Sequence, residues 1–300
     1  MEPFTFSALG TAWSILVDHD EFNDSDKKAL LSEIDLFEKR FSRFLPESEV
    51  NQFRSAQAGT YELSELFQVL LMRADRLRVL TGRVYDPAVG GLLEHAGYGP
   101  GYRLTTDNEL TEYRLPRWTL EGGRLTIDGP AVFDFGGIGK GYCIDLVAQA
   151  LERRGYQYFL VEGGGDMYGT TKRDDSPYRV ALEWPGQPDV AFGVVTLRYQ
   201  GVAVSDSFKR RWPASAKADR DEQAWHHIVD PHAKKPIARV VGGAAIAPNA
   251  FAADCMTSGI FLATSDRYEA LSQELQAEYV VFEQDGKARV SPHWPGELFS

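Results

Sequence analysis

The second half of the sequence is rich in short apolar segments that follow one another directly. We predict strands there at residues 158–162, 178–183, 192–199, 226–229, 240–246 and 279–282. Strands that succeed one another are typical of antiparallel pairs, whereas a doubly wound parallel sheet needs a long crossover, usually helical, between its strands. We therefore expect an α+β fold with mixed, largely antiparallel sheets packed against helices.

Helices are predicted where apolar residues recur every three to four positions. These segments are residues 25–41, 64–81, the stretch that follows the glycines at 136–141, residues 250–264 and residues 268–275. We expect Ser25 to cap the first helix, while Gly82 and Gly155 stand where helix-ending glycines belong. Near the N-terminus, residues 4–18 are predicted to be a strand broken at Gly10. With 300 residues, we expect a single domain over 1–300, built from two interwoven subdomains.

Composition excludes several classes of protein. A formal net charge of −11 opposes general binding to phosphate backbones, so no nucleic-acid partner is expected. The basic cluster 209–211 could meet phosphate or an acidic partner, but a solvated loop is the default. Two cysteines cannot form a disulfide framework, and no stretch approaches the ~18 apolar residues of a membrane helix. Since neither a signal peptide nor a lipid-attachment cysteine is visible, we expect a cytoplasmic protein, or a periplasmic one if an export signal has been removed.

The densest glycine segment runs from Asp134 to Tyr142 and leads into a predicted helix. It is not a P-loop, because Asp134 stands where the first glycine belongs and Gly141 follows Lys140 in place of Ser or Thr. It is not a dinucleotide fingerprint either, because Tyr142 occupies the place of the third glycine. Glycines that precede a helix with a lysine in its first turn could bind a phosphate. The same glycines could equally form a tight turn between a strand and the helix.

Two further segments could carry chemistry. His226 and His227 face opposite sides of a strand, so they cannot easily share a metal, and His227 is the better candidate for proton transfer. Asp254 and Ser258 lie one helical turn apart, which suits an oxygen-only Mg²⁺ site. The ordinary alternatives are a histidine bonded to backbone and an aspartate that caps a helix or pairs with a cation. The glycine run 163–165 is best explained as a turn.

Taken together and in this order, these segments resemble the ApbE-like family of FAD:protein FMN transferases. The matching motifs are Leu9-Gly10-Thr11, Ser42-Arg43-Phe44 with Ser48, Tyr85-Asp86-Pro87 with Gly90, Asp134 to Asp145, Val161 to Asp166, Ser205 to Phe208, His227 to Pro231, and Ala253-Asp254 with Ser258. The resemblance implies a T-fold-related architecture with a flavin pocket between the subdomains. It also implies Mg²⁺-dependent transfer of the FMN half of FAD to a Ser or Thr hydroxyl of an acceptor flavoprotein, with release of AMP.

The resemblance also assigns roles to residues of this chain. Metal binding falls to Asp254, Ser258 and the main-chain carbonyl of Gly139, with Thr257 beside them. The implied catalytic residues are His227 as base, Asp230 to steer it, Lys140 as a nearby positive charge and Asp145 as an alternative base. The implied FAD-binding residues are Leu9, Phe44, Asp86, Ala96, Gly97, Tyr98, Gly136, Tyr142, Ser205 and Val229.

The sequence departs from the family pattern at four places. Ser258 replaces a usual threonine but keeps the hydroxyl, and Thr257 stands where some members have a metal-binding aspartate. Ala96 replaces an aromatic residue, and Asp206 replaces a glycine. Two other functions would use the same pocket: a Mg²⁺-dependent FAD pyrophosphatase that releases FMN and AMP, and a non-catalytic FAD-binding protein.

Overall fold

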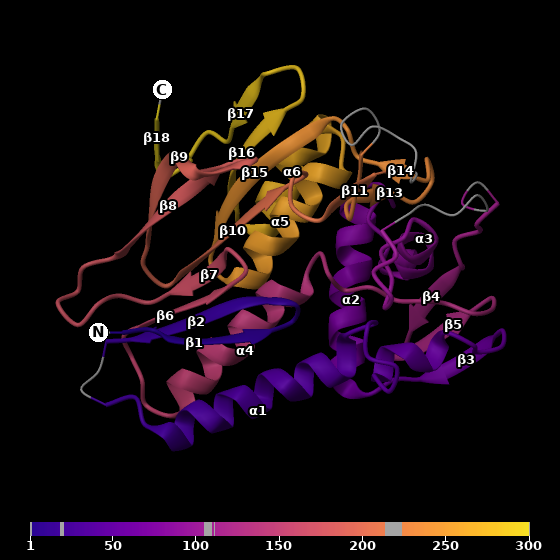
Figure 1. Ribbon diagram of the computed structural model, residues 1–300, viewed down its shortest axis with the longest axis horizontal. Helices are drawn as coiled ribbons and strands as arrows, with labels where there is room; N and C mark the ends of the chain where they lie inside the picture. Colours follow the sequence, from indigo (N-terminus) through magenta and orange to yellow (C-terminus); the bar gives the residue numbers. More distant parts are fainter. Residues whose placement is uncertain (1, 19–20, 105–109, 111, 214–223, 300) are drawn as a thin grey trace.

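The fold is that of a computed structural model, which describes residues 2–18, 21–104, 110, 112–213 and 224–299 (Figure 1). Its largest element is an eight-stranded sheet with the order β1-β2-β6-β7-β10-β15-β16-β17, in which every neighbouring pair is antiparallel. The strands are β1 Phe4–Ala8, β2 Thr11–Val17, β6 Phe159–Gly163, β7 Asp166–Gly169, β10 Gln200–Asp206, β15 Val240–Ala247, β16 Glu278–Glu283 and β17 Ala288–Val290. The expected α+β class with largely antiparallel sheets is therefore confirmed.

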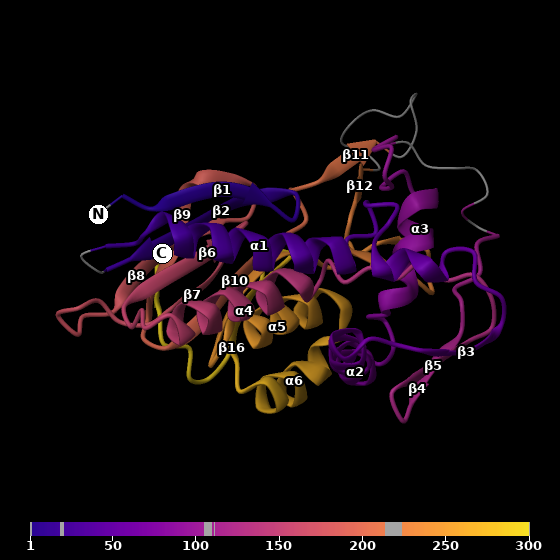
Figure 2. The ribbon, with the colours of Figure 1, turned by 90° about the horizontal axis from the view of Figure 1, so that it is seen from below.

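Helices cover one face of this sheet and a small sheet covers part of the other (Figures 1 and 2). The helices are α1 Asp24–Phe41, α2 Glu65–Leu80, α3 Gly90–His95, α4 Gly139–Arg153, α5 Ala250–Leu262 and α6 Tyr268–Leu275. The covering sheet has the order β18-β9-β8, with β8 Tyr178–Trp184, β9 Gln187–Leu197 and β18 Glu297–Leu298. Two apolar cores follow, because each face of the large sheet buries its own set of side chains.

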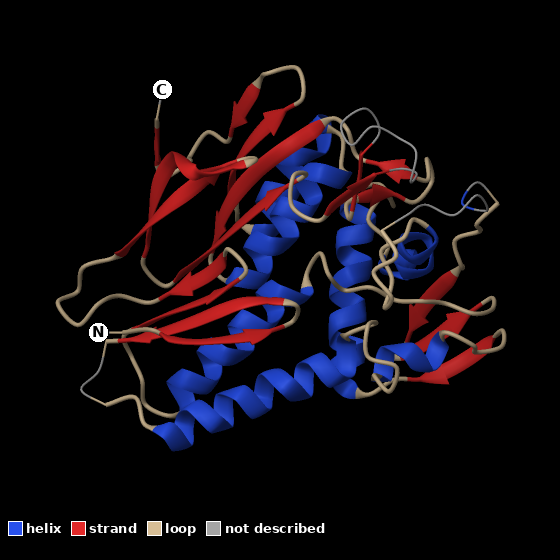
Figure 3. Cartoon of the chain, in the orientation of Figure 1, coloured by secondary structure: helices blue, strands red, loops and turns tan. Residues whose placement is uncertain are grey.

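Smaller elements gather at one end of the helical layer, where red strands and blue helices alternate in Figure 3. They form one three-stranded sheet of order β3-β5-β4 and two short hairpins, β11-β12 and β13-β14. The elements are β3 Gly59–Glu62, β4 Trp118–Glu121, β5 Arg124–Ile127, β11 Arg211–Pro213, β12 Ala224–His226, β13 Val229–Asp230, β14 Lys235–Pro236 and the 3₁₀ helices η1 Glu49–Phe53, η2 Pro87–Val89 and η4 Ser265–Arg267. Among the described residues, no helix is both long enough and apolar enough to cross a membrane.

Local sequence explains most helix ends. Ser64 caps α2, and Gly82 and Gly155 follow α2 and α4 with φ of +67° and +87°, as their positions predict. The prediction that Ser25 caps α1 is wrong, because the cap lies two residues earlier, where the Asn23 side chain accepts the amide of Asp26. Asn249 caps α5 in the same way by accepting the amide of Ala252.

The crossing of α4 and α5 depends on a missing side chain. A Cβ on Gly141 would lie 2.5 Å from the carbonyl oxygen of Ala250 and 2.7 Å from the Cβ of Asp254. The space is filled by the backbone of Ala250 and the Cβ of Asp254, and neither group can move aside easily because both belong to the packed helix α5. The glycine therefore sets how closely the first turn of α4 approaches α5.

We predict that Gly141→Ala lowers the free energy of unfolding by roughly 1–3 kcal/mol, because the added methyl overpacks this crossing. Urea denaturation followed by circular dichroism measures the loss. Gly139→Ala is the matched control on the same helix, since its Cβ would come no closer than 3.7 Å to Phe135 and should leave stability unchanged or raised. Equal stability of the two variants would contradict the importance of this close approach.

Candidate active site

A cavity of about 310 Å³ opens where the ends of the large sheet, the start of α4 and the segments around α3 meet. Its volume is in the range of small-molecule sites. It brings together ten of the residues that the sequence singled out, which come from seven separate stretches of the chain. They are Phe44, Asp86, Tyr98, Gly136, Lys140, Ser205, His227, Val229, Asp254 and Ser258.

Some predicted residues support the cavity without lining it. Leu9 has a positive φ of 51° and forms the β1–β2 turn that brings Gly10 to the wall. Gly97 has a φ of +100°, and the carbonyl of Ala96 accepts the indole N–H of Trp212 at 2.7 Å, so both residues hold Tyr98 in place. Thr257 is buried and its hydroxyl donates to the main-chain carbonyl of Asp254. Gly139 likewise does not line the cavity.

Tyr142 and Asp145 of α4 line a different hollow of about 320 Å³, which Arg73 of α2 and Phe251 of α5 also line. The carboxylate of Asp145 accepts the backbone amides of Ala250 and Phe251 at 2.9 and 3.0 Å, at the N-terminus of α5. Burial raises the pKa of Asp145 to about 6. The structure therefore makes Asp145 a capping residue for the helix that carries Asp254, and not a member of the main cavity.

Asp230 also has a structural role. Its Oδ1 accepts the amides of His232 and Ala233 at 2.8 and 3.0 Å, which closes the turn between β13 and β14. Within the described part of the chain it makes no hydrogen bond or ion pair with His227. The expectation that Asp230 steers His227 directly therefore finds no contact to support it.

Lys140 lies between two buried carboxylates. Its Nζ is 2.5 Å from Asp166 Oδ2 and 3.7 Å from Asp254 Oδ1. Burial works against its charge, but the two carboxylates outweigh burial and raise the pKa of Lys140. Burial raises the pKa of Asp254. Two contacts act in the opposite direction and lower it: the charge of Lys140, and the amide of Gly141, which donates to Oδ2 at 2.9 Å. Asp166 is fully buried at the start of β7 and was not assigned a role from the sequence.

The two neighbouring histidines differ as expected. His226 is buried, and its Nε2 lies 3.0 Å from the carbonyl oxygen of Ile237, which is the ordinary role of a core histidine. His227 faces the cavity, and its Nδ1 is buried without a hydrogen-bond partner among the described residues. Burial, together with the positive charge of Arg210, lowers the pKa of His227 to about 3, so the imidazole is neutral near pH 7.

Arg43, which belongs to the Ser42-Arg43-Phe44 motif but was assigned no role from the sequence, holds the aromatic wall. The buried guanidinium of Arg43 pairs with Asp134, donates to the carbonyl of Tyr98 at 2.8 Å and lies 4.2 Å from the ring centre of Phe44. Although burial works against it, Arg43 holds the pKa of Asp134 below its usual range. The rings of Phe44 and Tyr98 meet edge to face at 5.5 Å. This contact fixes two flat apolar surfaces at the cavity wall.

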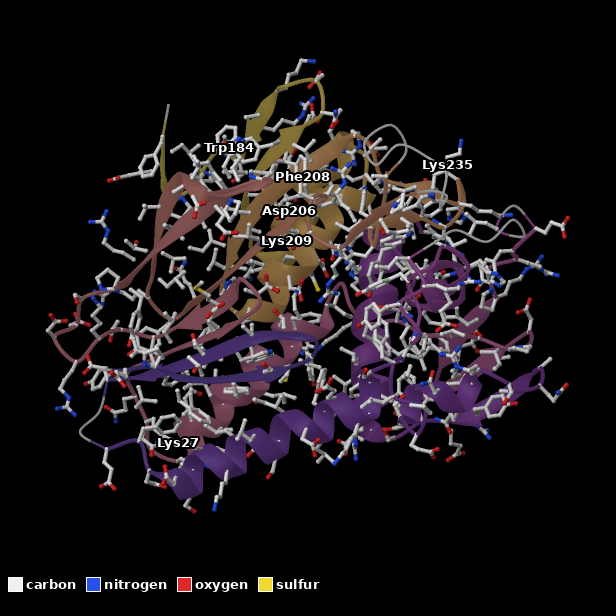
Figure 4. The ribbon with its side chains drawn as sticks, in the orientation of Figure 1. Lys27, Trp184, Asp206, Phe208, Lys209 and Lys235 are labelled. Carbon is white, nitrogen blue, oxygen red and sulfur yellow. The ribbon has the colours of Figure 1, made fainter. Side chains whose placement is uncertain are left out.

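Part of the basic cluster lines the cavity. Lys209 and Arg210 both line the cavity, and Arg210 donates to the hydroxyl of Tyr98 at 2.9 Å. Asp206 shapes this loop by accepting the amides of Phe208 and Lys209 at 2.8 and 2.7 Å, and Figure 4 labels these three residues close together after β10. The residue that replaces a family glycine therefore places cations at the site. Both side chains are also exposed, so the expectation of a solvated loop is confirmed for them even though they line the cavity.

Oxygen atoms also gather at the cavity wall, around Asp254 and Ser258 of α5. Ser258 Oγ donates to the carbonyl of Gly137 at 2.6 Å, one helical turn from Asp254. Among the described residues, no group of three or more His, Cys, Asp or Glu side chains is placed to hold a metal ion. The available donors are one carboxylate, one hydroxyl and main-chain carbonyls, which is a hard, oxygen-only set of the kind that suits Mg²⁺. Cys143 and Cys255 are buried and free, as expected of packing thiols.

Comparison with known proteins identifies the family. The ApbE family model matches residues 9–282, so the chain belongs to the ApbE family. The FAD:protein FMN transferase of Vibrio cholerae serotype O1 is 28% identical over 268 residues, covering 84% of this chain and 78% of the relative. That of Haemophilus influenzae is 27% identical over 266 residues, covering 82% and 75%. The assignment to this family of enzymes from sequence motifs is therefore confirmed.

Solved structures agree on the fold. The ApbE protein of Thermotoga maritima superposes with a TM-score of 0.83 at 24% identity, covering 97% of both chains. The flavin transferase ApbE of Vibrio cholerae superposes with a TM-score of 0.78 at 23% identity, again covering 97% of both chains. At these identities the likeness concerns the fold alone.

Proposed function

We propose that this protein transfers the FMN moiety of FAD to a Ser or Thr hydroxyl of an acceptor flavoprotein, forming a phosphoester bond and releasing AMP. One observation carries the proposal: a single cavity joins the Asp254–Ser258 oxygen cluster, two loop cations and an aromatic wall. The shared name of the curated relatives, FAD:protein FMN transferase, supports the same reaction. The aromatic wall suits a flavin ring, and the cations suit a pyrophosphate.

The charges orient the substrate within the cavity. We infer that the isoalloxazine lies against Phe44 and Tyr98, because flat rings stack well on aromatic side chains. The pyrophosphate then lies between Arg210 and the oxygen cluster, where fixed positive charge can stabilise its oxygens. The hydrogen bond to Asp166 holds the Lys140 ammonium at this end of the cavity, so the long side chain does not have to be ordered when the substrate binds.

The residues fit a bound Mg²⁺. Asp254, Ser258 and main-chain carbonyls of the 137–139 segment would hold it, Gly137 being the carbonyl that already contacts Ser258. When bound, the ion shields the pyrophosphate and stabilises charge on the leaving phosphate. Thr257 adds no free oxygen, because its hydroxyl is turned to the carbonyl of Asp254 and to Ser205.

The chemical step then needs a base for the acceptor hydroxyl. We propose that neutral His227 takes this proton while the hydroxyl oxygen forms a bond to the phosphorus of the FMN half. The bond from that phosphorus to the bridging oxygen breaks, and its electron pair leaves with AMP. The ammonium of Lys140 offsets the negative charge that grows on the phosphate oxygens.

The direct test is mass spectrometry of a candidate acceptor flavoprotein after incubation with FAD, Mg²⁺ and this protein. We expect the acceptor to gain one FMN moiety on a Ser or Thr, with one AMP released for each transfer. Replacing that Ser or Thr by Ala is the control and should abolish labelling. Free FMN and AMP with no labelled acceptor would show a pyrophosphatase instead, and intact bound FAD would show a binding protein.

We predict that His227→Ala retains FAD binding but lowers the transfer rate at least ~10²-fold, the usual minimum for loss of a general base. His293→Ala, which changes an exposed histidine outside the cavity, is the control. Since the pKa of His227 is about 3, the wild-type pH profile of kcat/KM should show no acid limb from this residue above about pH 5. A His227→Ala rate equal to the wild-type rate would place the base elsewhere.

We predict that Asp254→Asn weakens Mg²⁺ binding at least about tenfold, because the site loses its one charged ligand. Isothermal titration with Mg²⁺ alone measures this directly, and the transfer rate should fall in parallel. Asp266→Asn removes the same charge from the surface and should leave both quantities unchanged. An Asp254→Asn titration identical to that of the wild type would remove Asp254 from the metal site.

A further inference from the structure

Tyr85 lines the cavity and carries a buried hydroxyl that has no hydrogen-bond partner among the described residues. The residue is 6% exposed. Buried hydroxyl groups are nearly always paired, so an unpaired one at a cavity wall points to a partner that the ligand supplies.

The ring of Tyr85 lies beside the oxygen cluster. A Cβ on Gly137 would be 3.4 Å from Cε2 of the Tyr85 ring and 2.8 Å from Ser258 Oγ, so the ring and that hydroxyl flank the same glycine. Burial raises the pKa of Tyr85, and the nearby carboxylates of Asp134 and Asp254 raise it further. The phenol is therefore a protonated donor at the end of the cavity where the pyrophosphate is proposed to lie.

The neighbouring carboxylates already have other partners. Asp86 accepts from the amide of Ala88 and the indole of Trp118, both at 2.9 Å, and pairs with Arg78. Asp134 pairs with Arg43 and accepts the amide of Gly136, while Asp254 accepts the amide of Gly141. Within the described part of the chain none of these carboxylates accepts a hydrogen bond from Tyr85, so an oxygen of the ligand would supply the acceptor.

We propose that the Tyr85 hydroxyl donates a hydrogen bond to a non-bridging pyrophosphate oxygen of the substrate, which makes Tyr85 a further substrate-binding residue of the transfer reaction. This inference rests on the proposed function, because that function places a pyrophosphate here. A phosphate oxygen only accepts hydrogen bonds, so it matches a lone donor. Tyr98 is different, because its hydroxyl already accepts a hydrogen bond from Arg210.

The chain offers a matched control. Tyr178 on β8 is 4% exposed, and its hydroxyl is also buried and unpartnered among the described residues, but it lies in the core beneath the outer sheet, away from the cavity. Tyr85→Phe and Tyr178→Phe therefore remove the same atom from the same kind of environment. Only the first change removes a donor from the proposed site.

The test is isothermal titration of wild type, Tyr85→Phe and Tyr178→Phe, in the presence of Mg²⁺, with three probes: FAD, ADP and riboflavin. We expect Tyr85→Phe to bind FAD and ADP about ten- to a hundredfold more weakly, the usual effect of losing a hydrogen bond to a charged group. Riboflavin, which has no phosphate, should bind as it does to the wild type. Tyr178→Phe should match the wild type for all three probes.

Further measurements separate this role from a structural one. Without ligand, Tyr85→Phe should melt at or above the wild-type Tm, because no protein hydrogen bond is lost, and in transfer assays it should raise KM for FAD. Wild-type affinity for ADP in Tyr85→Phe, or an equal loss for riboflavin, would overturn the inference. Failure of the wild type to label an acceptor would overturn the proposed function instead. The ADP titration would still show whether Tyr85 binds the pyrophosphate.

Discussion

The site depends on one buried cation held between two carboxylates. Lys140 belongs to the first turn of α4, Asp166 begins β7 and Asp254 lies on α5, so their contacts tie the sheet to both helices. A buried ion pair is costly to break from one side, by roughly 3–5 kcal/mol, because the other charge is left uncompensated. The absence of a side chain at Gly141 allows α4 and α5 to approach closely enough for this arrangement.

Around this centre, each wall of the cavity has its own support. Arg43 holds the aromatic side, Asp206 shapes the loop that carries Lys209 and Arg210, and Asp145 caps the helix that carries Asp254. These supports contact the ends of different elements, so the cavity forms only when the whole chain has folded. An acidic protein thereby presents positive charge locally, which suits an anionic dinucleotide.

Sequence patterns predicted the long elements well and the short ones poorly. Helices α1, α2, α4 and α5 were predicted because apolar periodicity is a local signal, and the glycines that follow α2 and α4 are local signals too. The short helix α3, and strands β7 and β10 beside the site, were not predicted. Helix α3 and strand β7 have too few residues to show a periodicity, and strands β7 and β10 gain stability mainly from neighbours across the sheet.

The sequence by itself determined the fold class, the family and ten of the residues that line the cavity, because motif order and periodicity are properties of the chain alone. Only the tertiary structure decided which polar side chains bind other parts of the protein instead of facing the cavity. It turned Asp145 and Asp230 into capping residues and brought Arg210 and Tyr85 to the cavity. The reason is physical: a side chain's hydrogen-bond partners are set by residues distant in the chain, and packing alone brings them together.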